Sequence, residues 1–527
     1  MKKQLTYILF VTLSALLAAS CGKFGDINKD PNKISQDNTR NLFIRACQGT
    51  TFSVMSSSPA PQLDTYNPWT QIYPQYLGEG QNIQYTGLNI NQFGVATYYR
   101  LFMRNLKTIV QRNQDEATKN ETFVTLFGDG NDQIGVSMTL KAYYMMTLTD
   151  ALGMLPYSEA LMGDEGNFTP KYDSVKDIYE ALDKELNEAY AMMSPSGIHL
   201  DGDYDIIYRG DMSKWRSLNA SIRMCLAIKL SDVDPETGKA RFAKAFADGG
   251  IVDNASNMSY PYLAENDNAN PLYDNYFVSA RRDFWPTGTL VDAFLALHDP
   301  RVLSYAKPNF KDSVNPITGI PWGITKDELA TFKNTRNPSR LADRLIKIDA
   351  PFVMISAAKV KLMCAEAAVR GWISADANAL YEDAIRLSFE EKGVAEELKN
   401  IQDDEEGWSK IQAKNALVTT VDAYLAQDAV KLTGTNAEKI NKIAYQRWLN
   451  GFMQNGVEAW SDWRRLNVPA LSAGHQAVSA GIQTVPYRML YASDDTDQNR
   501  ESFQEVIAAQ GENEIYTRIW WDVADNK

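Results

Sequence analysis

The chain has 527 residues, of which 44% are hydrophobic and 23% charged, and its formal net charge is −13 at pH 7. This composition is that of a globular protein and excludes a disordered chain. The acidic balance argues against nucleic-acid binding, because phosphate contacts need clustered Lys and Arg. Four cysteines and three widely spaced histidines argue against a disulfide framework and a histidine-based zinc site.

The first 21 residues, MKKQLTYILFVTLSALLAASC, have the three parts of a secretory signal peptide. Lys2 and Lys3 form a basic start, and an apolar run over 7–17 follows that is shorter than the ~20 residues needed to span a bilayer. Small residues then end directly in Cys21, a pattern that resembles the bacterial lipobox. We therefore expect residues 1–20 to be removed and Cys21 to be acylated, with two or more chains giving firm membrane attachment. The alternative is cleavage elsewhere, with Cys21 an ordinary thiol.

A polar, proline-containing segment follows Cys21 and predicts a lipidated tether over 21–36. We expect a single body over 37–527. Within it, helical repeats are predicted at roughly 96–250 and 351–465. Residues 251–350 are rich in Asn, Asp, Pro, Gly and aromatic residues, which predicts an irregular insertion suited to ligand binding.

Helical periodicity, with apolar residues three or four positions apart, recurs along this body. Single helices are expected at 96–112, at 134–152 and from 174 onward. Three helix–turn–helix units are expected after them, at 212–248, 353–391 and 439–465. Cys225 and Cys364 fall in apolar helical runs, which predicts buried thiols. Paired helices with Ala and Leu at the crossings are typical of tetratricopeptide-type repeats, although a generic helical bundle also fits the pattern.

Aromatic residues are abundant, with 11 Trp, 26 Tyr and 20 Phe, and several lie in polar loop-like segments. Ring faces cover the C–H patches of sugars, while amide, carboxylate and guanidinium groups bind their hydroxyls. The segments TYNPWTQIYPQY, ARRDFWPTGTL and GIPWGIT offer this combination. Their candidate ligand-binding residues are Tyr66, Asn67, Trp69, Gln71, Tyr73, Arg281, Arg282, Asp283, Trp285 and Trp322. The alternative is that these rings fix the loops onto the helical body.

Metal binding and catalysis have weaker support. The loop AENDNANPLYDN holds Glu265, Asp267 and Asp274 among several Asn, an oxygen-rich set of the kind calcium prefers, although the spacing matches no EF-hand and such loops are commonly just solvated. The chain contains no G-x-S-x-G or H-E-x-x-H motif, and we expect no enzymatic activity and no required cofactor. A surface hydrolase using a chance carboxylate pair stays open as an alternative.

Five segments, taken in order, resemble the motifs of one family: DINKDPN, GMLPYSEAL, NPLYDNYF, AWSDWRRLNVP and VPYRMLYASDDTDQN. Together with the lipobox they span most of the chain. The chain is thereby identified as a member of the SusD/RagB-like outer-membrane lipoproteins of Bacteroidetes, nearest to the SusD-like second subgroup. Trp460 and Trp463, in the fourth segment, are expected to be structural, with Arg464 and Arg465 pairing with nearby acids or helix ends.

The resemblance implies a mainly all-α fold of tetratricopeptide-like helix pairs with long irregular insertions. It implies a lipoprotein, facing outward from the outer membrane, that captures a glycan or oligosaccharide and hands it to a SusC-like TonB-dependent β-barrel transporter. Capture of oligopeptides by the same mechanism is an alternative, as is a scaffold that binds only partner proteins through its repeats. Surface-exported lipoproteins of this group often carry acidic residues close behind the lipidated cysteine. Here Gly22 and Lys23 follow Cys21 and the first acid is Asp26, so the outward orientation is inferred from the family resemblance alone.

Overall fold

The structure is a computed structural model that describes residues 37–53, 56–57, 66–67, 69–80, 95–265, 268–479 and 481–523. The predicted signal peptide, the lipidation of Cys21 and the tether therefore lie outside the described residues. Within these ranges, no helix combines the length and apolarity needed to cross a bilayer.

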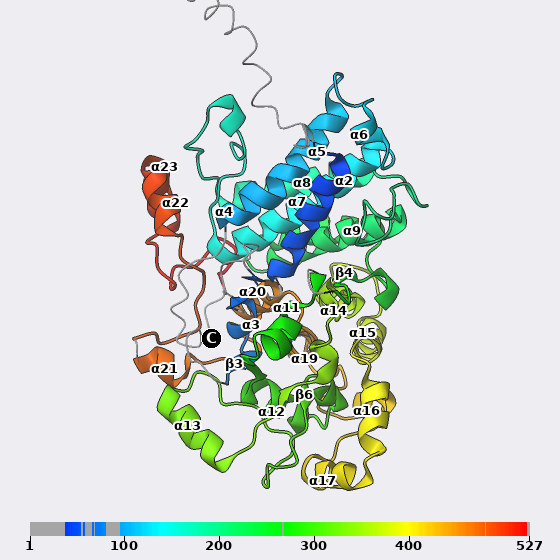
Figure 1. Ribbon diagram of the computed structural model, residues 1–527, viewed down its shortest axis with the longest axis vertical. Coiled ribbons are helices and arrows are strands. Elements are labelled where there is room, and N and C mark those ends of the chain that lie inside the picture. Colours follow the sequence, from blue (N-terminus) through cyan, green and yellow to red (C-terminus); the bar gives the residue numbers. More distant parts are fainter. Residues whose placement is uncertain are drawn as a thin grey trace, which may run out of the picture.

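Most helices of the N-terminal half of the body pack together in the upper part of Figure 1, where they are coloured blue to green. Helices α5 and α8 pack on α7, which is buried along most of its length. In α8, Val175, Ile178, Leu182 and Leu186 form one buried stripe three or four residues apart, and the side chain of Ser174 caps the first turn. The helices of this half are α2 (Thr39–Cys47), α5 (Arg104–Gln114), α6 (Thr122–Thr125), α7 (Gly130–Leu152), α8 (Val175–Met192), α9 (Met212–Lys229) and α10 (Pro235–Ala247).

Three further contacts between helices continue the repeat: α9 packs with α10, α14 (Ala357–Val369) with α15 (Ala377–Glu391), and α14 with α19 (Asn436–Asn450). Helix α20 (Gly456–Leu466) follows α19 and completes the last pair. Two sulfur contacts join α9 to α14, with Cys225 Sγ 3.7 Å from Met363 Sδ and Cys364 Sγ 3.8 Å from Met224 Sδ. The mainly helical fold and the buried thiols are thus as predicted.

The expected helix over 353–370 begins later than predicted. Residues Phe352–Ile355 form strand β8, which pairs antiparallel with β4 (Met258–Tyr260). Ser356 then caps α14 by accepting a hydrogen bond from the Lys359 backbone N–H. A strand partner about 95 positions earlier in the chain takes the apolar residues that periodicity had assigned to the helix.

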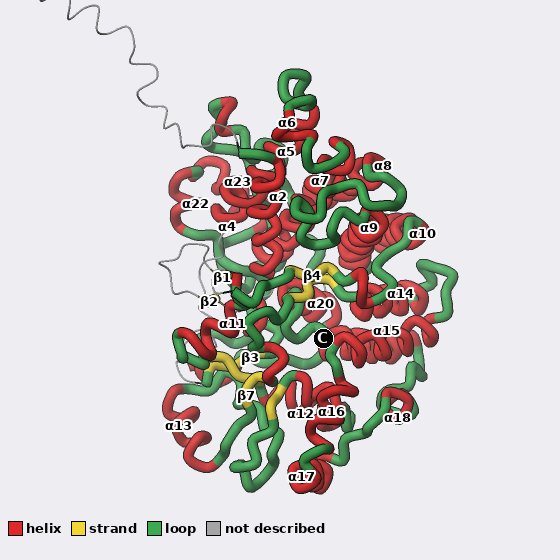
Figure 2. The backbone as a smooth tube through the Cα atoms, turned by 45° about the vertical axis from the view of Figure 1, so that its right-hand side comes forward, coloured by secondary structure: helices red, strands yellow, loops and turns green. Residues whose placement is uncertain are grey.

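The insertion consists of short strands and helices, and its strands lie between the helical layers (Figure 2). All described strands pair in antiparallel two-stranded ribbons. In one of them, β3 (Leu77–Glu79) pairs with β5 (Phe284–Pro286), placing Gly78 opposite Trp285. The remaining described elements are β1 (Ser56–Ser57), β2 (Tyr66–Asn67), α3 (Trp69–Ile72), α4 (Val95–Thr97), α11 (Pro271–Tyr273), α12 (Gly288–Ala296), β6 (Ala306–Lys307), α13 (Lys326–Thr335), β7 (Arg340–Leu341), α16 (Val394–Gln402), α17 (Glu405–Asn415), α18 (Val421–Leu425), α21 (Gly474–Ser479), α22 (Ser493–Gln498) and α23 (Arg500–Gln510). Short 3-10 and π-helical segments are η2 (Gln48–Ser53), η3 (Tyr98–Met103), η4 (Gly163–Glu165), η5 (Asn254–Ser256), η7 (Asp274–Val278), η8 (Pro300–Ser304) and η9 (Asp343–Leu345).

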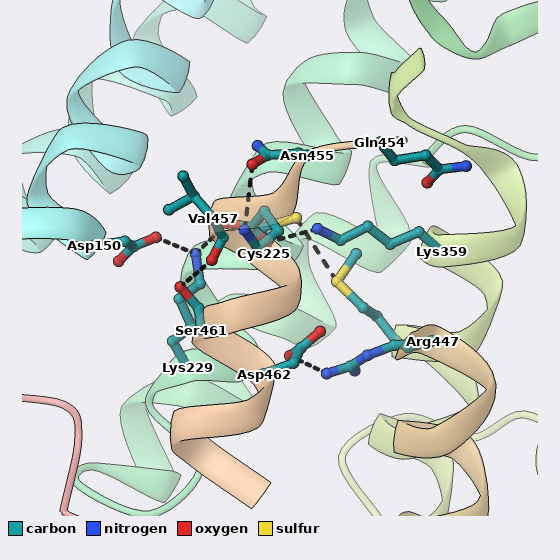
Figure 3. Close-up of polar contacts among 12 residues, drawn as sticks. Asp150, Cys225, Lys229, Lys359, Arg447, Gln454, Asn455, Val457, Ser461 and Asp462 are labelled. Carbon is teal, nitrogen blue, oxygen red and sulfur yellow. Dashed lines mark hydrogen bonds and ion pairs between the residues drawn. The ribbon is translucent and has the colours of Figure 1, made fainter. Parts of the chain in front are cut away.

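Buried charges join the helix pairs at the centre of the molecule (Figure 3). Lys229 on α9 forms ion pairs with Asp150 on α7 and with Glu458 on α20, the latter at 2.5 Å. Lys359 on α14 reaches the second oxygen of Glu458 at 2.7 Å. Because an unpaired charge in the interior is costly, these pairs favour one relative placement of the four helices.

A second buried cluster surrounds Glu366 on α14. Its carboxylate accepts hydrogen bonds from Arg447, Arg465 and Arg370. The predicted pairing of Arg465 with an acid is thereby confirmed. Arg464 donates to the Asp150 carbonyl in the last turn of α7 at 2.7 Å, which confirms the predicted contact with a helix end. It also donates to the Tyr487 carbonyl and stacks on Trp460, with its guanidinium carbon 3.8 Å from the ring centroid.

Candidate ligand-binding site

The first predicted binding segment lies mostly inside the body. The side chains of Tyr66, Asn67 and Trp69 are outside the described residues. Gln71 is fully buried, donating to the Gln454 carbonyl at 2.8 Å and accepting from the Met453 N–H at 3.0 Å.

Tyr73 is also fully buried, and its ring meets Trp460 edge-on at 5.0 Å between centroids. Burial raises the pKa of this phenol well above its usual value. The expectation that Gln71 and Tyr73 present exposed polar and aromatic groups is therefore wrong. Both were assigned to the surface because their segment is polar, but helix α20 and the turn before it cover that segment.

The second predicted segment forms β5 and the loop before it. The Trp285 indole is 4% exposed, and its Nε1–H donates to the Arg282 carbonyl at 2.8 Å. A Cβ at Gly80 would lie 2.4 Å from the indole, so only glycine permits this close approach. Lys333 Nζ and the Arg340 guanidinium carbon lie 5.1 and 5.0 Å from the ring, within cation–π range.

Asp283 holds the loop that precedes β5. Its buried carboxylate pairs with Arg281 Nε at 2.8 Å and accepts from Asn275 Nδ2 at 3.2 Å. Arg282 adopts a left-handed backbone with φ of 53°, and its Nε donates to the Tyr276 carbonyl. These bonds leave the Arg281 side chain 38% exposed at the surface of the insertion.

Trp322 lies in a segment bonded to the end of β5. Ile320 donates its N–H to the Pro286 carbonyl at 2.9 Å and accepts from the Gly288 N–H at 2.7 Å. Trp322 itself is 8% exposed and packs against Gly474. Among the described residues, none accepts a hydrogen bond from its indole N–H. The structure thus gathers Arg282, Asp283, Trp285 and the segment of Trp322 at one end of the insertion.

One aromatic pair with an exposed ring was missed by the sequence reasoning. Tyr273 and Phe277 lie on α11 and η7 with their ring centroids 5.2 Å apart, and Phe277 is 54% exposed. Four positions later, Arg281 is exposed as well. The signal was present in NPLYDNYF, a polar segment with three rings, which was used only as a family motif and as part of a calcium loop.

The structure describes two of the three carboxylates in the predicted calcium loop, so calcium binding there stays a prediction. Glu265 accepts from Asn268 at 3.0 Å, Asp274 begins η7, and Asp267 lies outside the described residues. In the part of the chain that the structure describes, no group of three or more His, Cys, Asp or Glu side chains is arranged so that it could hold a metal ion.

Residues 31–492 match the SusD-like family described as starch-binding and associating with the outer membrane. One similar solved structure is a chitin-binding protein, with 24% sequence identity and a TM-score of 0.71, covering 92% of this chain and 99% of that chain. A second is a SusD homologue from Bacteroides fragilis, with 24% identity and a TM-score of 0.73, covering 91% of this chain and 99% of that chain. A third is a chitin-binding SusD homologue from Flavobacterium johnsoniae, with 20% identity and a TM-score of 0.72, covering 93% of this chain and 100% of that chain. The comparison with curated proteins finds no match.

Proposed function

The chain belongs to the SusD-like family of outer-membrane-associated proteins, and we propose that it captures an extracellular glycan at the cell surface without cleaving it. The family match over residues 31–492 carries this proposal. The chitin-binding descriptions of two similar structures support a polysaccharide-derived ligand. Acylation at Cys21 would tether the body to the membrane.

The surface around Phe277 and Arg281 is the part of the insertion best suited to a sugar. Phe277 offers an exposed ring face for a C–H patch, and Arg281 offers exposed N–H donors for hydroxyl groups. The Asp283 carboxylate fixes the Arg281 side chain, so less side-chain entropy is lost when a ligand binds.

The predicted site residues extend this proposal. Asp283 and Trp285 are buried behind the exposed groups, and Trp285 bonds to the loop that carries Arg281, whereas Arg282 is itself exposed. Trp322 is buried in the segment bonded to the end of β5, so its contact with the ligand stays a prediction. Contacts of Tyr66, Asn67 and Trp69 with the ligand stay a prediction.

Calorimetric titration of soluble protein lacking residues 1–21 tests the capture role, with chitin, starch and peptide oligomers as ligands. Phe277→Ala should weaken glycan binding at least about fivefold, the loss of about 1 kcal/mol typical of a contributing interface residue. Phe168→Ala is the matched control, because this ring is 80% exposed but lies in the loop before α8. If the folded protein binds no glycan, the proposal is wrong, and binding of peptides alone would favour the oligopeptide alternative.

We further propose that the ligand passes to a SusC-like TonB-dependent barrel. In cells, Phe277→Ala should lower uptake of the bound glycan while co-purification with the barrel is unchanged. Unchanged uptake would favour the pure scaffold, because such a protein needs no ligand contact.

A further inference from the structure

A cavity of about 300 Å³ lies where the insertion meets the second half of the helical body. Its walls come from the β4–β8 ribbon, the 3-10 turn at Asp343–Leu345, the end of α15 and the turn after α19. It shares no lining residue with the surface around Phe277 and Trp285. This volume is at the lower end of the range for ligand pockets and suits a molecule of about monosaccharide size.

Three charged side chains line this cavity: Arg344, Glu391 and Lys392. Lys392 is 4% exposed, and its Nζ pairs with Glu391 at 2.8 Å. The same carboxylate also accepts two hydrogen bonds from Gln454 Nε2, at 3.1 and 3.0 Å. One carboxylate is therefore shared between a buried ammonium and a buried amide.

The second cation, Arg344, is half-buried, and within the part of the chain that the structure describes its carboxylate interaction is a longer-range one with Glu397, where it offsets part of the rise in pKa that burial causes. Arg344 donates to the Glu391 carbonyl at 3.0 Å. Among the described residues no carboxylate oxygen lies within 4 Å of its guanidinium, although Glu397 lines the neighbouring cavity together with Arg344. The cavity wall thus carries two positive charges and one negative charge.

The electrostatics of Lys392 agree with this excess of positive charge. Burial lowers the pKa of its ammonium, the attraction of Glu391 offsets only part of that effect, and Arg344 and Arg301 lower it further. A second carboxylate in the cavity would offset the burial of Lys392 and give the half-buried Arg344 a close partner, because buried charges are stabilised by close partners.

We propose that this cavity is a second binding site, for a small carboxylate-bearing ligand of about monosaccharide size. Its carboxylate would lie between Arg344 and Lys392, since guanidinium groups bind carboxylates through two parallel hydrogen bonds. The apolar walls supplied by Phe352 and Phe452 would take the C–H surface of the ligand. A neutral sugar lacks the group that both cations require.

Titration of the soluble protein with D-glucuronate, D-glucose and acetate tests this site. We expect saturable binding of glucuronate with a Kd of about 1 mM or below. Acetate should compete with it, and glucose should not. Arg344→Gln should weaken glucuronate binding about tenfold or more, the usual loss for a charge-assisted hydrogen bond. Lys347→Gln, which removes a nearby exposed cation, should leave binding unchanged.

Thermal unfolding and circular dichroism of each variant show whether it is folded, and Arg344→Lys, which keeps the charge but not the planar fork, should bind with intermediate affinity. Phe277→Ala should retain glucuronate binding, which separates this site from glycan capture. Absence of saturable glucuronate binding up to about 10 mM, equal binding of glucose, or full binding by a folded Arg344→Gln would overturn the proposal.

Discussion

Replacing Glu366 by Gln should strongly destabilise the body. The carboxylate is fully buried and accepts from Arg465 at 2.5 and 2.8 Å, from Arg447 at 2.8 Å and from Arg370 at 2.8 Å. Glutamine keeps the shape but has one acceptor oxygen, and its amide N–H groups face the arginine donors. Asp462 is then the carboxylate left to Arg447 and Arg465.

Removing one partner of a buried ionic group costs about 3–5 kcal/mol. With a urea m-value of about 3 kcal/mol/M, this corresponds to a fall in the unfolding midpoint of roughly 1–1.7 M. The assay is equilibrium urea unfolding of the soluble protein, followed by tryptophan fluorescence and by circular dichroism, at pH 7.

Glu406→Gln provides the matched control, because Glu406 pairs with Lys410 at 2.6 Å on the exposed face of α17. Exposed pairs contribute little, so this midpoint should not move measurably. If Glu366→Gln shifts the midpoint by no more than Glu406→Gln does, the reasoning from buried charge is refuted.

Three further outcomes are expected. Burial alone would raise the pKa of Glu366, but the Arg465 and Arg447 guanidinium groups hold it well below its usual range. The ionised carboxylate therefore contributes its full stabilisation above about pH 4.3, the pKa of Glu in the unfolded chain, and this contribution is lost as the pH falls below that value. The difference in unfolding free energy between wild type and Glu366→Gln should accordingly narrow in urea titrations from about pH 5 to pH 3. Gly456→Ala should lower the thermal unfolding temperature, because its Cβ would lie 1.7 Å from the Thr70 carbonyl oxygen, whereas Gly163→Ala, with 3.7 Å to its nearest neighbour, should not. Thiol labelling at pH 8 of protein lacking Cys21 should require unfolding, since burial raises the pKa of all three thiols, Cys47, Cys225 and Cys364, the latter two to about 12; rapid labelling of the native protein would contradict this.

Local pattern was sufficient for the helical part of the fold. The apolar stripe of α8 and the contact of α9 with α14 follow from apolar residues spaced three and four positions apart, because such residues lie on one face of a helix. The ordered motifs also identified the family, because they depend on residue identity and not on packing.

Exposure of individual side chains was decided by tertiary structure. Trp285 and Tyr73 stand in polar segments, yet Gly80 and the cations of α13 and β7 enclose the first, and Trp460 covers the second. Phe277, from an equally polar segment, stays exposed. The sequence by itself determined which segments form helices and to which family the chain belongs. Which ring faces solvent, and which cations share one cavity, depended on contacts between residues up to several hundred positions apart, and those contacts form only when the chain has folded.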